Sequence, residues 1–189
     1  SSSLEIFPRS WYEDHGIELI TGTRALSINR ESKILTLDSG APLPYDELIL
    51  ATGSRPFIPP IPGHDSRKVL LYRTIADLEK IIVYASGKKS AAVIGGGLLG
   101  LEAAQALQSL GLKTTVIERA NFLMPQQLDQ SAADLLQKKV LDQGITLQLG
   151  VQNTSIAETL EGLSLTLDDI LSLDVDLVLI SAGITPNSE

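Results

Sequence analysis

The sequence has no cysteine among its 189 residues. A chain without thiols forms no disulfide, offers no thiolate nucleophile, ligates no iron–sulfur cluster and has no C-x-x-C redox pair. The two histidines, His15 and His64, are not clustered with other ligand residues. We therefore expect no metal site and no catalytic side chain in this chain.

Positive charge is also scarce, because the chain has 15 Lys and Arg but 23 Asp and Glu, which gives a net charge of −8. An acidic chain is repelled by nucleic-acid phosphates, so we expect no nucleic-acid partner. No apolar run approaches the roughly 18 residues that a membrane span requires. The opening SSSLE lacks the basic start and apolar core of a signal peptide. These absences predict a cytoplasmic protein with no membrane partner.

What the sequence does have is a glycine turn after an apolar run. Residues 91–94 are short and apolar, which is typical of a buried parallel strand. Gly95, Gly97 and Gly100 follow with the spacing G-x-G-x-x-G. In that pattern the first glycine permits a tight turn, the second lets the backbone approach a pyrophosphate, and the third lets helix and strand pack closely. The following helix N-terminus presents N–H groups to the phosphates.

A second strand and a carboxylate complete the pattern. Residues 114–117 are β-branched, and Glu118 follows them, 23 residues after Gly95. At this spacing a carboxylate accepts hydrogen bonds from an adenosine ribose, and it favours NADH because it repels the 2′-phosphate of NADPH. The neighbouring Arg119 could accommodate that phosphate, so the sequence leaves NADPH open as the less favoured cofactor. The pattern predicts a dinucleotide site.

Alternating strands and helices predict an α/β fold, namely a Rossmann-like dinucleotide-binding domain with a parallel sheet, flanking helices and a late antiparallel β excursion. Thr74 and Asp77 fit a capping box, and Asp129 fits the N-cap of a later helix. Residues 56–63 are rich in proline and fit an extended connector. The expected helices are 9–16, 74–85, one from the glycine turn to 110 and one from 129 to 144, and the expected strands are 17–20, 23–28, 33–37, 48–51, 91–94, 114–117, 145–149, 155–160, 163–167 and 175–181.

Three segments together resemble the FAD-dependent pyridine nucleotide-disulfide oxidoreductases. They are residues 45–56 (YDELILATGSRP), 93–102 (VIGGGLLGLE) and 178–187 (VLISAGITPN), and their order and spacing also match that family. Within the family, residues 11–13 (WYE) and 123–129 (LMPQQLD) are most similar to the large subunit of NAD(P)H nitrite reductase. NADH:rubredoxin reductases are close relatives with the same motifs.

The resemblance implies a role for each matching residue. Glu102 is similar to an acid that reaches the nicotinamide carboxamide in relatives, although the helix dipole alone favours an acid in a first helical turn. Arg55 is similar to a residue near the flavin nucleotide, and reads equally well as a surface residue. The residues expected to bind cofactors are Gly95, Gly97, Leu98, Leu99, Gly100, Glu102, Glu118, Arg119, Ala182 and Gly183 for NADH, and Ala51, Thr52, Gly53 and Arg55 for FAD in the intact protein.

The chain departs from the family pattern in two places. Members carry two G-x-G-x-x-G units and a later flavin-binding segment with Gly-Asp, whereas this chain has one glycine unit and no such segment. We therefore expect a fragment in which residues 1–68 are the middle part of a truncated FAD-binding domain and residues 69–189 form an NAD(P)H-binding domain.

The resemblance implies an activity for the intact enzyme, which would pass hydride from NADH to FAD and electrons on to a metal centre, while this fragment alone would be inactive. The expected partners are the remaining parts of the same reductase or a metal-centre electron acceptor, with a homodimer also open. Two rivals remain, a rubredoxin or ferredoxin reductase and a non-catalytic NADH-binding module.

Overall fold

The computed structural model describes residues 5–188. Backbone contacts divide the chain into two compact units, with the division between Ala51 and Thr52. The first unit holds one helix and an antiparallel three-stranded sheet of order β1-β2-β3. Its elements are α1 (Arg9–Asp14), β1 (Ala25–Asn29), β2 (Ile34–Leu37) and β3 (Pro42–Pro44).

The prediction of two strands in the first unit is wrong. Residues 17–20 and 48–51 form no strand, although both segments are apolar. A strand needs a hydrogen-bonded neighbour, and neither segment pairs with another part of the described chain. Ile49 and Leu50 are 90% and 60% exposed, so these side chains have no core to enter within the described residues. Apolar composition alone therefore misled the prediction there.

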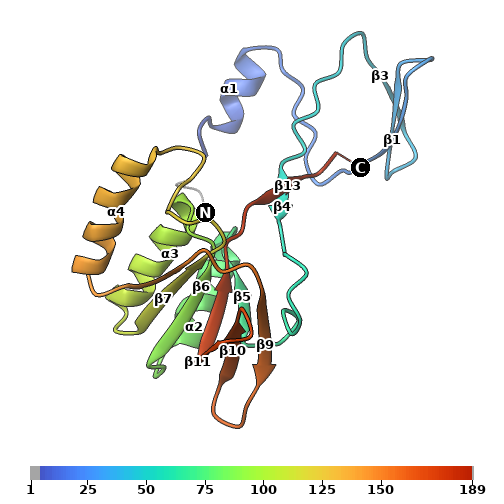
Figure 1. The fold of residues 1–189 in the computed structure, drawn as a ribbon. Coiled ribbons are helices and arrows are strands. Elements are labelled where there is room, and N and C mark those ends of the chain that lie inside the picture. Colours follow the sequence, from blue (N-terminus) through green and yellow to red (C-terminus); the bar gives the residue numbers. More distant parts are fainter. Residues whose placement is uncertain (1–4, 189) are drawn as a thin grey trace. The chain divides into compact units, whose positions relative to one another are not determined.

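The second unit is built on a parallel sheet of five strands in the order β5-β12-β6-β7-β8 (Figure 1). A three-stranded antiparallel sheet, β11-β10-β9, and a two-stranded antiparallel ribbon, β13-β4, accompany it. The elements are β4 (Ser54–Pro56), β5 (Val69–Leu71), α2 (Ile75–Ala85), β6 (Ser90–Ile94), α3 (Leu98–Ser109), β7 (Lys113–Glu118), α4 (Gln130–Asp142), β8 (Thr146–Leu149), β9 (Thr154–Glu158), β10 (Leu163–Leu167), β11 (Leu171–Val175), β12 (Leu177–Ile180) and β13 (Ile184–Pro186).

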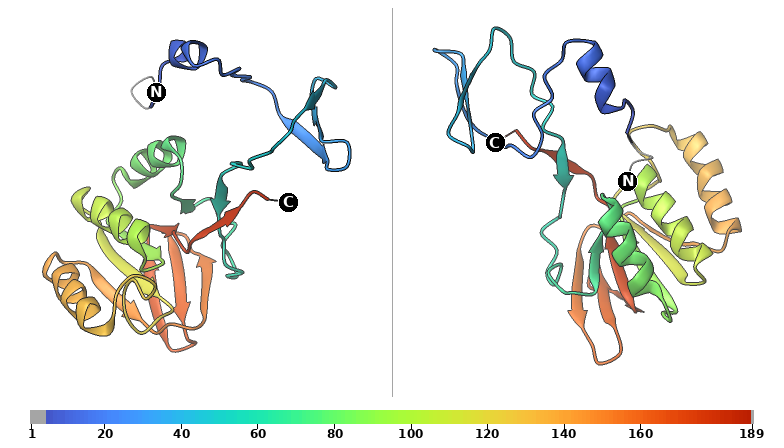
Figure 2. Two further views of the ribbon diagram at one scale, coloured as in Figure 1. Left: turned by 90° about the horizontal axis from the view of Figure 1, so that it is seen from above. Right: turned by 180° about the vertical axis from the view of Figure 1, so that it is seen from behind.

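The second unit has three layers. Helices α2, α3 and α4 cover one face of the parallel sheet, and the β9–β11 sheet covers the other (Figures 1 and 2). Along β6, Ala91 and Val93 pack under the helices, while Ala92 and Ile94 pack under the antiparallel sheet. A strand buried on both faces is apolar throughout, which is why residues 91–94 show no polar alternation.

The α/β prediction, with its late antiparallel excursion, is confirmed. The capping box is present, because the Thr74 hydroxyl accepts from the Asp77 N–H at 3.1 Å and the Asp77 carboxylate accepts from the Thr74 N–H at 2.9 Å. Asp129 caps α4 by accepting from the Ala132 N–H. No helix among residues 5–188 is both long and apolar enough to cross a bilayer.

The single strand expected at 175–181 is instead two strands that separate at Asp176. The Asp176 carboxylate accepts the N–H groups of Lys89 and Ser90 at 2.8 and 2.9 Å, and so joins this corner to the start of β6. Burial raises the pKa of Asp176, but the hydrogen bonds from Lys89 and Ser90 outweigh burial, so its pKa lies below the ordinary 3.8. The charged carboxylate therefore stabilises the folded chain.

We expect Asp176→Ala to lower the free energy of unfolding at neutral pH by about 1–2 kcal/mol, because two backbone donors lose their acceptor. A lowered folded-state pKa means that this contribution is complete above the unfolded-state pKa and disappears as pH falls through the folded-state value. Urea unfolding at successively lower pH should therefore show the wild type and the variant converging. The exposed Asp174 supplies the control: if Asp174→Ala behaves identically, the special role of Asp176 is wrong.

Candidate functional site

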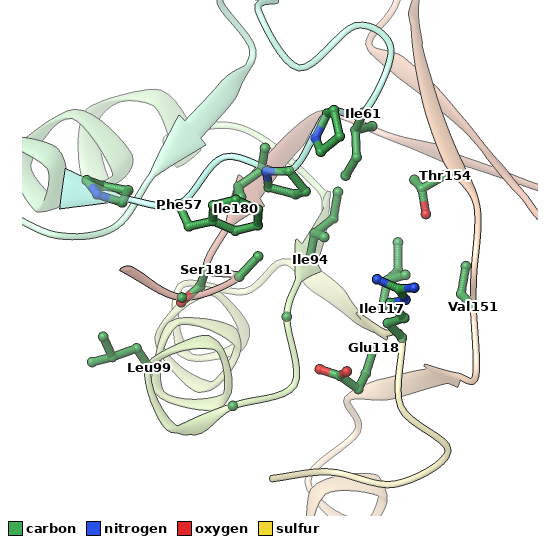
Figure 3. Close-up of a pocket in the computed structure, with 18 of the residues that line it drawn as sticks. Phe57, Ile61, Ile94, Leu99, Ile117, Glu118, Val151, Thr154, Ile180 and Ser181 are labelled. Carbon is green, nitrogen blue, oxygen red and sulfur yellow. The ribbon is translucent and has the colours of Figure 1, made fainter. Parts of the chain in front are cut away.

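A cavity of about 1020 Å³ opens at the carboxyl ends of the parallel strands in the second unit. Ile180, Ile94 and Ile117, from the ends of β12, β6 and β7, form its floor (Figure 3). The chain runs from β6 to β7 and β8 on one side and adds β12 on the other, so the strand order reverses at β6. Ligands of open α/β sheets bind in the crevice at such a switch point.

The glycine turn forms one wall of this cavity. Gly95 has φ +120°, and a Cβ placed there would lie 2.2 Å from the Ser181 carbonyl oxygen, so no larger residue fits. A Cβ at Gly100 would lie 2.0 Å from the Gly95 carbonyl oxygen, which shows how closely α3 approaches the turn. The absence of a side chain at these two positions therefore lets the glycine turn pack against the backbone after β12 and against α3.

Gly97 differs from them because it faces open space. It is the N-cap of α3, its backbone is extended (φ −82°, ψ −180°), and a Cβ there would meet no atom of residues 5–188 within 4 Å. The backbone N–H groups of the first turn of α3 have no intrahelical acceptor and carry the positive end of the helix dipole. Leu98 and Leu99 follow Gly97 on this rim and also line the cavity. A phosphate group could therefore reach the backbone here.

The Glu118 carboxylate lies at the end of β7 and turns toward the glycine turn (Figure 3). Its Oε2 accepts the Gly96 N–H at 2.6 Å, and its Oε1 accepts the Ala120 N–H at 2.8 Å. A carboxylate has about four acceptor positions, so two hydrogen bonds leave capacity for ligand hydroxyl groups. Glu118 both holds the turn and remains able to accept from a ribose.

Two residues that hold the glycine turn in place, Gly96 and Leu123, were not predicted from the sequence. Gly96 is buried, and a Cβ there would lie 2.8 Å from Leu123 Cδ2 and 3.0 Å from Glu118 Cβ. The Met124 N–H donates to the Gly96 carbonyl at 3.1 Å, which fixes the loop after β7 against the turn. The run of three consecutive glycines, with Gly96 in the middle, was a visible signal for Gly96. Nothing local in the sequence marks Leu123.

Other parts of the cavity wall come from segments that the sequence did not single out for binding. Phe57 and Ile61 belong to the proline-rich connector and point into the cavity (Figure 3). Gln152 lines the cavity beside Arg119, and the Arg119 Nε donates to Gln152 Oε1 at 3.4 Å. Ala182 and Gly183, which follow β12, line the cavity as expected.

Glu102 lies outside the cavity lining and is exposed. Helix α3 begins at Leu98, and its first turn contains no acidic residue. Glu102 therefore lies beyond that first turn. The interpretation that the helix dipole alone explains this acid is therefore wrong, since the dipole effect falls off within the first turn.

Three of the residues expected near FAD, Thr52, Gly53 and Arg55, lie on the β4–β13 ribbon or directly before it and are not among the residues that line the cavity. The Thr52 hydroxyl donates to the Asn187 carbonyl, and the Asn187 side-chain amide donates back to the Thr52 carbonyl at 3.1 Å. The Asn187 N–H donates to the Gly53 carbonyl at 3.0 Å, and Arg55 Nη1 lies 3.5 Å from Asn187 Oδ1. Ala51 is the last residue of the first unit.

The chain is similar to curated proteins that are much longer. It is 41% identical over 193 residues to the nitrite reductase (NADH) large subunit of Escherichia coli K12, covering 100% of this chain and 23% of that protein. It is 45% identical over 180 residues to the NAD(P)H nitrite reductase of Bacillus subtilis 168, covering 94% of this chain and 22% of that protein. The chain thus spans less than a quarter of either relative.

Solved structures share the fold. The ferredoxin reductase for the CYP199A2 system from Rhodopseudomonas palustris matches with a TM-score of 0.88 at 33% identity, over 98% of this chain and 46% of that one. The water-forming NADH oxidase of Lactobacillus brevis, bound to NADH, matches with a TM-score of 0.81 at 30% identity, over 93% of this chain and 40% of that one. A family model for pyridine nucleotide-disulphide oxidoreductases matches residues 4–189, and the chain belongs to that family.

Proposed function

We propose that this chain is the NAD(P)H-binding module of an FAD-dependent reductase, with NADH as the preferred nucleotide. The observation that carries the proposal is the cavity at the strand ends, which Gly97 leaves open and which Glu118 borders. A pyrophosphate would lie against the Gly97 backbone and the α3 N-terminus, and the adenosine ribose would lie against Glu118. The Lactobacillus brevis relative, whose structure holds NADH, supports the same assignment.

The preference for NADH follows from charge. The Glu118 carboxylate would repel a 2′-phosphate but accept hydrogen bonds from a 2′-hydroxyl. Arg119 lines the same end of the cavity and reduces the repulsion, so we propose a preference for NADH with residual binding of NADPH. Both nucleotides occur in the names of the nitrite reductase relatives.

In the intact reductase, residues 69–189 would form the NAD(P)H domain, and residues 1–68 would contribute to the FAD domain through Ala51, Thr52, Gly53 and Arg55. FAD supplies the hydride-accepting chemistry when it is bound. The residues of this chain bind and orient the nicotinamide nucleotide, with Leu99, Ala182 and Gly183 bordering the cavity. Electrons would then leave for a metal centre elsewhere, as in a nitrite reductase.

A second candidate is a ferredoxin or rubredoxin reductase, which differs only in its electron acceptor. The close structural match to the Rhodopseudomonas palustris ferredoxin reductase favours it, whereas the 41% and 45% identities to nitrite reductases favour the first candidate. The NADH site proposed here is common to both.

The proposal is tested by titrating the purified chain with NADH and with NADPH in a calorimeter, after recording its absorbance spectrum. We expect NADH to bind more tightly than NADPH. A flavin band in the spectrum would show that these residues also retain FAD. Failure of both nucleotides to bind would contradict the proposal and favour a role without nucleotide.

Replacing the Glu118 carboxylate by an amide removes its negative charge and nearly preserves the shape of the side chain. Glu118→Gln keeps one acceptor oxygen for the Gly96 N–H but removes the negative charge that would repel a 2′-phosphate. We expect NADH affinity to fall and NADPH affinity to fall less or to rise, which shifts their ratio toward NADPH by roughly tenfold, or about 1.4 kcal/mol. Equal changes for the two nucleotides would remove Glu118 from the ribose site.

A further inference from the structure

We infer that Gln152 is a positioning residue that holds Arg119 beside Glu118 and thereby sets how well the site accepts a 2′-phosphate. The inference rests on the proposed nucleotide site and extends it to a residue outside the glycine motif. Gln152, Arg119 and Glu118 all line the same cavity. In this arrangement Gln152 limits the discrimination between NADH and NADPH that Glu118 would otherwise impose.

The Gln152 side chain makes three hydrogen bonds. Its amide nitrogen donates to the carbonyl oxygens of Arg119 at 3.0 Å and Gly150 at 2.9 Å. Two carbonyl neighbours require the amide nitrogen on that side, so the amide oxygen faces the Arg119 Nε at 3.4 Å. Gln152 thus contacts both the main chain and the side chain of Arg119.

The backbone fixes this pairing in place. The Val151 N–H donates to the Glu118 carbonyl at 3.1 Å, and the Gly150 N–H donates to the Ala120 carbonyl at 2.9 Å. These bonds attach the loop after β8 to the last residue of β7 and to the residues that follow it. Gln152 therefore cannot shift along the chain relative to Arg119 without breaking them.

The antiparallel sheet supports the loop from the other side. The Asp168 carboxylate, at the turn between β10 and β11, accepts the N–H groups of Gln152 at 3.0 Å and Asn153 at 2.7 Å. The Asp168 N–H donates to the Asn153 carbonyl at 2.9 Å. The late β excursion therefore holds the segment that carries Gln152, in addition to covering the sheet.

A guanidinium held at Nε keeps its four Nη hydrogens for a ligand. Arginine binds phosphate best when its planar group is already oriented, because less rotamer freedom is then lost on binding. An NADPH 2′-phosphate beside Glu118 would need such a cation to offset the carboxylate, whereas the 2′-hydroxyl of NADH would not. Loss of Gln152 should therefore affect NADPH selectively.

The test compares Gln152→Ala, Arg119→Ala and the double variant by calorimetry with NADH and NADPH. We expect Gln152→Ala to weaken NADPH binding by roughly three- to tenfold, the scale of one ordinary hydrogen bond, with NADH binding changed less than about twofold. In the Arg119→Ala background the Gln152 change should have no further effect on NADPH, because the two residues act through one contact. Gln105→Ala, on the exposed face of α3, is the matched control.

Two results would overturn the inference while leaving the proposed function intact. One is an equal loss for NADH and NADPH in Gln152→Ala, which would indicate a structural role for the loop. The other is a full-sized effect of Gln152→Ala on NADPH when Arg119 is already alanine. If the wild type binds neither nucleotide, the proposed function fails, and the inference fails with it.

Discussion

Gly97→Val is expected to abolish dinucleotide binding while leaving the fold intact. The backbone at Gly97 is extended, a conformation open to any residue, and a Cβ there would meet no atom of the described chain within 4 Å. The isopropyl group would instead occupy the space where the pyrophosphate must approach the backbone. We expect the Kd for NADH to rise by at least about a hundredfold, or about 2.7 kcal/mol, measured by calorimetry.

The stability of the same variant is the essential control. An N-cap glycine replaced by valine should cost about 1 kcal/mol or less, because Gly97 makes no side-chain cap that valine would remove. Urea unfolding measures this cost. Gly97→Ala should give an intermediate loss of NADH affinity, since its methyl group fills less of the approach. Undiminished NADH binding by the valine variant would show that the pyrophosphate lies elsewhere.

Gly95→Ala, in contrast to Gly97→Val, should mainly lower the stability of the fold. The residue has φ +120°, and the new Cβ would lie 2.2 Å from the Ser181 carbonyl oxygen and 2.8 Å from the carbonyl carbon. Those atoms belong to the backbone after β12, so no side-chain rotation can relieve the clash. We expect the free energy of unfolding to fall by more than about 3 kcal/mol, from strain and displaced backbone together.

Gly111 provides a comparison with the same kind of backbone but no crowding. Its φ is +90°, it follows α3, and no atom of the residues that the structure describes lies within 4 Å of a Cβ placed there. Gly111→Ala should therefore cost only the conformational strain, about 1 kcal/mol. Thermal or urea unfolding of both variants isolates the clash at Gly95. If the two variants lose equal stability, close approach of the strand ends is not what requires Gly95.

Local patterns predicted the parts of the fold that depend on local chemistry. The caps at Thr74 and Asp129, the buried strand at 91–94 and the helix after the glycine turn all follow from side-chain types at short spacing. Gly95 and Gly97, found from the glycine spacing, and Glu118, found from its distance along the chain, line the cavity, and their binding of a dinucleotide stays a prediction. These features need no knowledge of distant partners.

Features that depend on long-range pairing were not predicted. Strand β5 is only three residues long and is a strand because it pairs with the distant β12, with Val69 opposite Val178. Gln152 reaches Arg119 only because β8 lies beside β7. Residues 48–51 show the converse, since this apolar run has no pairing partner among the described residues and forms no strand. Composition cannot distinguish these cases.

Under the proposed function, Glu118 couples the choice of cofactor to the folding of the glycine turn. Its carboxylate accepts the Gly96 and Ala120 N–H groups as well as bordering the cavity. A substitution that removes the acid in order to admit NADPH would also remove at least one of the two oxygens that accept these backbone N–H groups. Evolution or engineering toward NADPH must therefore supply a replacement acceptor at the same position, or lose the geometry that binds any dinucleotide. Retaining the acid and placing a cation beside it, the role proposed for Arg119, would avoid that conflict.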